Sequence, residues 1–111
     1  MEGAASPSLG FEGLSTRQRN RLRRNSKLLF GNQDRLEVLV AIAQSPDGMV
    51  NATDLQEAIG MAQSRVRNQL VALARVGLLV KFPQPGGKTW YRRVDSSIWG
   101  AGLSLYEEWS A

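Results

Sequence analysis

The chain has 111 residues, of which 42% are hydrophobic, and these values are typical of one small globular domain. It contains no cysteine and no histidine, which excludes disulfides, thiolate metal sites, catalytic triads and imidazole bases. No apolar run approaches the ~20 residues of a membrane span, and the N-terminus lacks the pattern of a signal peptide. We therefore expect a cytoplasmic protein that spans no membrane, uses no cofactor and is not an enzyme.

The net charge of +4 comes from the N-terminal part of the sequence. Residues 1–30 hold six basic and two acidic side chains, whereas residues 31–111 hold eight of each. A basic segment of this kind indicates contact with a nucleic acid or another anionic surface. The alternative is that the charges only keep one face of a helix in solvent.

Residues 1–14 are rich in Gly, Ser, Pro and Ala, so we expect a flexible tail ahead of a domain that covers residues 15–111. Ser15 and Gln18 have the spacing of a capping box, which predicts a basic helix over residues 15–30. The first two turns of this helix contain few apolar residues. We therefore expect its outer part to be exposed.

A second helix is predicted over residues 33–44, where apolar residues cover nearly the whole circumference and indicate burial on several sides. The Ser-Pro-Asp-Gly sequence at residues 45–48 has the composition of a type I turn, and the following Met-Val pair is long enough only for a bridge strand. Asn51 then caps a short helix that ends at Gly60.

The next predicted helix covers residues 63–76 and is closed by a glycine. Residues 79–94 follow as a hairpin with a Gly-rich loop, and the last predicted helix, over residues 96–109, starts at an Asp/Ser cap. The predicted fold is therefore mainly α-helical, with one small β-hairpin between the helical segments.

The helix over residues 63–76 is amphipathic. Val66, Leu70 and Leu73 fall within about 60° of one another on a helical wheel, so this stripe should face a core. The opposite arc should face a polar or anionic partner, although an ordinary surface helix has the same pattern. That arc and its shoulders contain Ser64, Arg65, Arg67, Asn68, Val71 and Arg75.

The run LQEAIGMAQSRVRNQLVALARVGLLVKF, residues 55–82, resembles the winged helix-turn-helix of bacterial regulators, most closely the arsenic-repressor-like (ArsR-type) group. In that family a short helix ends at a glycine, a polar Gln-Ser pair opens the second helix, and another glycine precedes the wing strand. The resemblance covers residues 32–94, and the family carries extra helices in the places of residues 15–30 and 96–109. It implies a winged helix-turn-helix fold and a DNA-binding transcriptional regulator.

The resemblance also implies that residues 63–76 form a recognition helix in the major groove of double-stranded DNA. The wing, residues 79–94, would then lie on the adjacent backbone or in the minor groove. Arginine pairs with guanine, and glutamine or asparagine with adenine, so the side chains suit this role. For each single residue the alternative is simple exposure to solvent. The expected DNA contacts are Gln63, Ser64, Arg65, Arg67 and Asn68 in the helix, Lys88 and one outward wing arginine, Arg92, and, as an added contact, Arg17, Arg21 and Arg24 in the basic helix.

The sequence departs from the family pattern in two ways that matter for function. Ala62 stands where the family has a capping Ser or Thr, which leaves the start of the recognition helix without a side-chain cap. Many members sense metals or redox state through Cys and His, and this chain has neither. We therefore expect no metal sensing through those residues.

The final predicted helix carries more apolar surface than one small domain should cover, and exposed patches of that kind mark interfaces. In the resembling family the terminal helices form a two-fold dimer. We therefore expect a homodimer with Trp99, Leu103 and Tyr106 at its interface. The alternative is that these side chains close the core of a single chain.

The leading hypothesis is a sequence-specific, homodimeric transcriptional regulator that acts on DNA in the cytoplasm, in association with the nucleoid. A winged-helix module that binds another protein remains open, because residues 31–111 have no net charge. A DNA-binding replication, partition or phage-control protein also remains open, because it would use the same chemistry.

Overall fold

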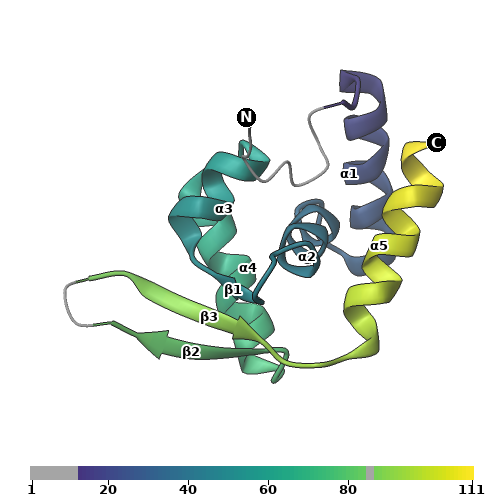
Figure 1. The fold of residues 1–111 in the computed structure, drawn as a ribbon. Helices are drawn as coiled ribbons and strands as arrows, with labels where there is room; N and C mark the ends of the chain where they lie inside the picture. Colours follow the sequence, from purple (N-terminus) through teal and green to yellow (C-terminus); the bar gives the residue numbers. More distant parts are fainter. Residues whose placement is uncertain (1–12, 85–86) are drawn as a thin grey trace, which may run out of the picture.

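A computed structural model describes residues 13–84 and 87–111 (Figure 1). The predicted mainly helical fold with one hairpin is confirmed. The predicted tail falls largely on residues 1–12, which lie outside the described range. The helices are α1 (Thr16–Phe30), α2 (Arg35–Ala43), α3 (Ala52–Ile59), α4 (Gln63–Arg75) and α5 (Ser97–Ser110), and the strands are β1 (Met49–Val50), β2 (Leu79–Pro83) and β3 (Thr89–Arg93).

Local signals set the ends of several helices. At the start of α1, Gln18 N donates to Ser15 Oγ at 3.1 Å and Ser15 N donates to Gln18 Oε1 at 2.8 Å, so the predicted capping box is present. Asn51 Oδ1 accepts the Asp54 amide at 2.9 Å, and Gly60 ends α3 with a φ of 76°. α2 begins later than predicted, because Asn32 Oδ1 accepts a backbone amide two residues on and holds a turn there.

The sheet is antiparallel, with the order β1-β3-β2. β3 is therefore the central strand: Val50 pairs with Tyr91 on one side, and Lys81 pairs with Tyr91 on the other. The predicted turn before β1 closes with a hydrogen bond from Gly48 N to Ser45 O of 3.3 Å. The two-residue β1 thus anchors the hairpin to the helical part of the fold.

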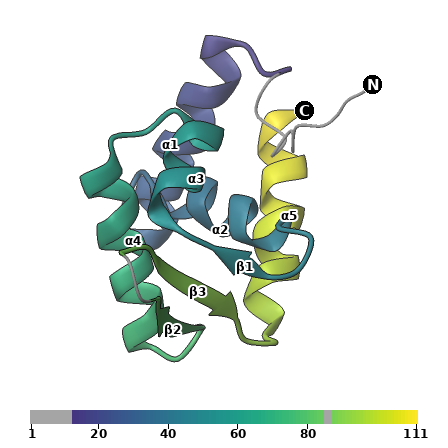
Figure 2. The same ribbon diagram turned by 60° about the vertical axis from the view of Figure 1, so that its left-hand side comes forward.

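α2 is the central element of the fold. In Figure 1, α1 and α5 lie on one side of α2, and α3, α4 and the hairpin lie on the other; the turned view of Figure 2 shows α2 between α4 and α5. Gly102 of α5 faces α2 closely, since a Cβ there would be 3.5 Å from Leu39 Cβ. The prediction that α2 is buried on several sides is confirmed by its buried side chains Leu36, Val38, Leu39, Val40, Ala41 and Ile42.

One buried position of α2 is a carboxylate. Glu37 is 1% exposed, and its oxygens accept hydrogen bonds from Arg19 Nε at 2.6 Å and Arg23 Nε at 3.1 Å. A carboxylate in the interior is tolerated only when it is paired and hydrogen-bonded, and two arginines of α1 supply this here. Thr16, Arg17 and Asn20 in the first turns of α1 are exposed, as expected, whereas Arg19 is partly covered where it meets Glu37.

The start of α1 also binds the end of α5. Arg21 donates from Nε to the Trp109 carbonyl at 2.8 Å and from Nη2 to the Ala111 carbonyl at 2.7 Å, and Gln18 Nε2 donates to the Ser110 carbonyl at 2.8 Å. These side chains satisfy carbonyls that the last turn of a helix leaves without partners. The two helices are therefore antiparallel neighbours, as Figure 1 shows.

Much of the apolar face of α5 packs within the chain. Trp99 is 7% exposed, and its Nε1 donates to the Val94 carbonyl at 2.7 Å. Leu103, Tyr106 and Trp109 are half-buried against the core. For Trp99, the structure therefore favours the alternative that the aromatic residue closes the core of a single chain.

Candidate nucleic-acid interface

α3 and α4 form a helix-turn-helix whose second helix is amphipathic as predicted. Val66, Leu70 and Leu73 are buried, whereas Ser64, Arg67, Asn68 and Val71 are exposed on α4. Ala62, at the N-cap of α4, makes no side-chain cap hydrogen bond. No side chain therefore caps the first turn of α4, which favours binding of an external acceptor such as a phosphate there.

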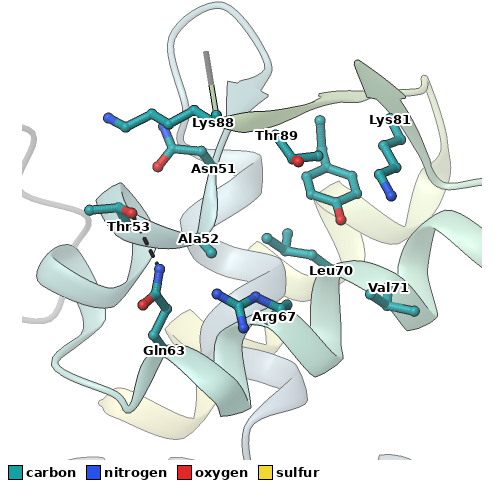
Figure 3. A pocket seen from close by; sticks show the side chains of 12 residues that line it. Asn51, Ala52, Thr53, Gln63, Arg67, Leu70, Val71, Lys81, Lys88 and Thr89 are labelled. Atoms are coloured by element: carbon teal, nitrogen blue, oxygen red, sulfur yellow. Dashed lines mark hydrogen bonds between the residues drawn. The ribbon is translucent and has the colours of Figure 1, made fainter. Parts of the chain in front are cut away.

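A basic hollow of about 280 Å³ lies between the start of α3, the exposed side of α4 and the hairpin (Figure 3). No Asp or Glu is among the described residues that line it. Gln63 donates from Nε2 to Thr53 Oγ1 at 3.3 Å across its edge, shown by the dashed line in Figure 3. The side chains that line this basic hollow include Asn51, Thr53, Gln63, Arg67, Lys81, Lys88, Thr89 and Tyr91.

The basic hollow brings together cations from two different elements. Arg67 projects from α4, and Lys81 and Lys88 project from the hairpin (Figure 3). None of the three belongs to the ion pairs found among the described residues. Three uncompensated positive charges around one concavity attract an anion such as a phosphodiester group.

The structure brings the predicted residues Gln63, Arg67 and Lys88 to one surface. It adds Lys81 and Thr53, which the sequence analysis does not name. Strand alternation places Lys81 on the same face of the sheet as Leu79 and its pair Tyr91, opposite to Arg92, and this is the signal that could have placed Lys81 beside α4. Thr53 has no such signal, because its place beside α4 depends on the angle at which α3 crosses it.

Arg65 pairs with a carboxylate of its own chain. Its Nε donates to Asp34 Oδ2 at 3.0 Å, and its Nη2 donates to Asp34 Oδ1. The hydrogen bond with Asp34 raises the pKa of the Arg65 guanidinium above its ordinary value, against an opposing effect of burial. Arg65 therefore ties α4 to the start of α2, which does not favour the predicted role in reading bases.

A buried glutamine reinforces this connection. Gln69 accepts a hydrogen bond from Arg35 Nε at 2.5 Å and donates to Asn32 Oδ1 at 2.9 Å. Asn32 and Arg35 flank the α1–α2 junction and the start of α2, so the network fixes the orientation of α4 on its scaffold. The helical wheel indicates no role for Gln69, because its partners are more than 30 residues away in sequence.

The two arginines at the end of β3 point to opposite faces of the sheet, as predicted from strand alternation. Arg93 Nη1 donates to the Ile42 carbonyl at 2.7 Å and the Ala43 carbonyl at 3.0 Å, so it closes the C-terminal end of α2. Arg92 is exposed, and its guanidinium carbon lies 5.1 Å from the centre of the Phe82 ring. Of this pair, only Arg92 is available for an external contact, although it does not line the basic hollow.

The basic residues of α1 do not join this surface. α1 lies across α2 from the hairpin (Figure 1), and Arg21 is bound to carbonyls of α5. Arg17 and Arg24 are exposed on α1 and line a separate surface depression. The structure therefore places Arg17, Arg21 and Arg24 together on α1, but apart from Arg67 and Lys88.

Within residues 13–84 and 87–111, no helix has the length and apolar character needed to cross a membrane. The same residues contain no cluster of three or more acidic, His or Cys side chains arranged to hold a metal ion.

Comparison with known proteins gives a family match and several structural neighbours. Residues 36–83 match the IclR helix-turn-helix domain. The AntR antimony-specific transcriptional repressor is 31% identical, with a TM-score of 0.57, and the match covers 96% of each chain. No curated protein matches the sequence.

Two further neighbours are MarR family transcriptional regulators from Streptomyces coelicolor. One is 23% identical with a TM-score of 0.65, over 84% of this chain and 71% of that chain. The other, solved in complex with DNA, is 17% identical with a TM-score of 0.64, over 85% of this chain and 62% of that chain. These two show the same fold, and the AntR match covers nearly the whole sequence. The chain therefore belongs to the winged helix-turn-helix family of transcriptional regulators.

Proposed function

We propose that the chain is a homodimeric, sequence-specific regulator that places α4 in the major groove of double-stranded DNA and the hairpin on the adjacent backbone or minor groove. The observation that carries this proposal is the basic hollow, where Arg67, Lys81 and Lys88 meet beside the exposed face of α4. This arrangement combines side chains that read base edges with cations that bind phosphates. One structural neighbour was solved in complex with DNA, which supports DNA binding by this fold.

Within the family we propose an ArsR-type assignment, which the likeness to AntR over the whole chain supports. AntR is an antimony-specific repressor. The present sequence offers neither thiolate nor imidazole ligands. We therefore propose that its DNA binding is not regulated through a metal site built from Cys or His.

We propose that two chains associate through α1 and α5. Leu28 and Leu29, near the end of α1, are 78% and 58% exposed, although large apolar side chains are usually covered. Leu103 and Tyr106 of α5 are half-buried and leave part of their surface open. The interface proposed here therefore adds the two α1 leucines to Leu103 and Tyr106 and leaves Trp99 in the core.

Truncation of the exposed polar side chains of α4 tests base reading. We expect Arg67→Ala and Asn68→Ala each to weaken binding to a selected DNA site by about 1–3 kcal/mol, and to weaken binding to a scrambled site less. Arg75→Ala, an exposed arginine at the far end of the same helix, is the matched control. Titration of labelled duplexes measures both affinities. If Arg67→Ala and Asn68→Ala reduce the difference in affinity between the selected and the scrambled site no more than the control does, α4 does not read the sequence.

Neutral variants of the hairpin lysines test phosphate binding. We expect Lys81→Gln and Lys88→Gln each to reduce the salt dependence of DNA affinity, and the slope should change by about 0.9 for every phosphate that is no longer neutralised. Lys27→Gln, on the exposed side of α1, should leave the slope unchanged. Affinities measured across a series of salt concentrations give these slopes. If the salt slope changes with Lys27→Gln but not with the hairpin variants, the DNA contacts α1 instead of the hairpin.

A further inference from the structure

Val71 is an apolar residue within the exposed face of α4. It lies seven residues after Ser64 and three after Asn68, so the helical period places these three side chains on one face. Val71 is 43% exposed, whereas the apolar residues on the opposite face of α4 are buried. A β-branched residue is slightly less favourable than alanine in a helix, and a side chain that stays this exposed gains little from burial. The stability of the chain therefore gives little reason for a valine at this position.

The surroundings of Val71 are cationic. It lines the basic hollow with Arg67, one turn earlier on α4, and Lys81, which points toward α4 from β2 (Figure 3). It also lines a neighbouring groove of about 250 Å³, whose lining includes Ala74 and Tyr91. With Arg67 on a base edge and Lys81 on a phosphate, as in the proposed function, Val71 lies against the DNA surface between these two contacts.

We infer that Val71 reads the 5-methyl group of a thymine in the major groove, and this inference rests on the proposed function. The methyl group is the apolar feature that distinguishes thymine there, and proteins recognise it by apolar contact. Valine suits this contact because one χ1 rotamer dominates in helices, so its methyl groups lose little freedom on binding. The site therefore selects a T·A pair at one position of each half-site, in addition to the bases that polar side chains read.

The same contact disfavours the other bases at that position. Cytosine lacks the methyl group and presents an amino donor, and Val71 offers no acceptor for it. Adenine and guanine present ring-nitrogen acceptors, and Val71 offers no donor. A polar group that loses water without gaining a partner costs binding energy, so each of these replacements should weaken the complex.

Uracil substitution tests the inference, because deoxyuridine differs from thymidine only in lacking the methyl group. Thymines of a selected duplex are replaced by uracil one position at a time, and titration of labelled duplexes at constant salt gives the affinities. We expect one position in each half-site at which the native chain binds about fourfold more weakly for each methyl group lost. Val71→Ala should bind the thymine duplex more weakly by a similar factor, and it should bind the thymine and uracil duplexes equally.

Two control variants separate the contact from general effects on α4. Val76→Ala removes an exposed valine that follows α4 directly but lies outside the basic hollow, so it should retain the full sensitivity to uracil. Val71→Ile keeps a branched apolar side chain and should retain it as well. Alanine favours the helix, so Val71→Ala should remain folded, and circular dichroism checks this.

Cytosine methylation provides a second measurement at the position that uracil identifies. A C·G pair there should weaken binding by the native chain. Replacing that cytosine with 5-methylcytosine should recover about fourfold for each methyl group restored, because the methyl group returns to the same place in the groove. The recovery should be absent in Val71→Ala.

Three results would contradict the inference. Native binding that no uracil substitution weakens would overturn it and leave the proposed function intact. Equal sensitivity of the native chain and Val71→Ala to uracil would also overturn it, because another side chain would then contact the methyl group. A native chain that selects no duplex from a random library would refute the proposed function and the inference together.

Discussion

Glu37→Gln is expected to lower the free energy of unfolding by about 3 kcal/mol. The substitution leaves Arg19 and Arg23 facing a neutral side chain in a site where the native carboxylate is 1% exposed. The expected value is at the lower end of the range for breaking a buried pair, because both arginines are partly exposed and can turn toward water. Chemical denaturation followed by circular dichroism measures the change.

The matched control is Glu57→Gln, an exposed carboxylate on α3. Surface substitutions of this kind usually change stability by about 0.5 kcal/mol or less. If Glu37→Gln and Glu57→Gln unfold at the same denaturant concentration, the ion pairs of Glu37 do not hold α1 on α2. The pairing of Arg19 and Arg23 with Glu37 would then contribute little to stability, while Arg21 would still bind the end of α5.

The double variant Leu28→Glu and Leu29→Glu is expected to lower DNA affinity about a hundredfold or more. Two linked half-sites bind far more tightly than either half-site alone, and like charges on the apolar surface should separate the two chains. Both leucines are exposed in the single chain, so the variant should remain folded. Sedimentation measures the association, and titration of a palindromic duplex measures the affinity.

The control for charge is Lys27→Glu, which places a carboxylate at an exposed site of α1 without removing apolar surface. It should retain most of the self-association. A native chain that sediments as a monomer at tens of micromolar without DNA would contradict the proposed dimer. A double variant that remains dimeric would show that the interface lies elsewhere.

The helices and strands could be predicted because each depends on residues that are close in sequence. Ser15 and Gln18 form the capping box, Asn51 and Gly60 delimit α3, and alternation separates the two arginines of β3. The stripe of α4 follows from the helical period alone. These signals depend on one turn of a helix or a few residues of a strand, so a single sequence contains them.

The charged residues are harder to assign, because their partners are distant in sequence. The helical wheel places Arg65 on the shoulder of the polar arc and the family resemblance implies that it contacts DNA, but this side chain binds Asp34, which lies 31 positions earlier. Glu37 lies in a helix that is apolar on nearly all sides. Its carboxylate nevertheless accepts hydrogen bonds from Arg19 and Arg23 of another helix, which the sequence pattern does not reveal. A helical wheel shows that a side chain points outward from its own helix. It does not show whether another element covers it.

Neither of the two hollows could be predicted from the sequence, because each is formed by elements that are distant in sequence. Arg67 and Lys88 are both predicted from the sequence, but only the packing of the hairpin beside α4 places them with Lys81 around one concavity. The second hollow, which lies beside Arg35, is lined by residues of four helices and of the turn that follows α4, so no local pattern could indicate it.

The central claim, sequence-specific binding of a dimer to DNA, is tested most directly by selecting duplexes that bind the native chain from a random library. We predict enrichment of a palindrome whose half-sites are centred about 10 base pairs apart, one turn of the double helix. Such a spacing lets two copies of α4 enter successive major grooves on one face of the DNA. A selected pool with no preferred sequence, although the chain retains DNA, would contradict specific recognition and leave only phosphate binding.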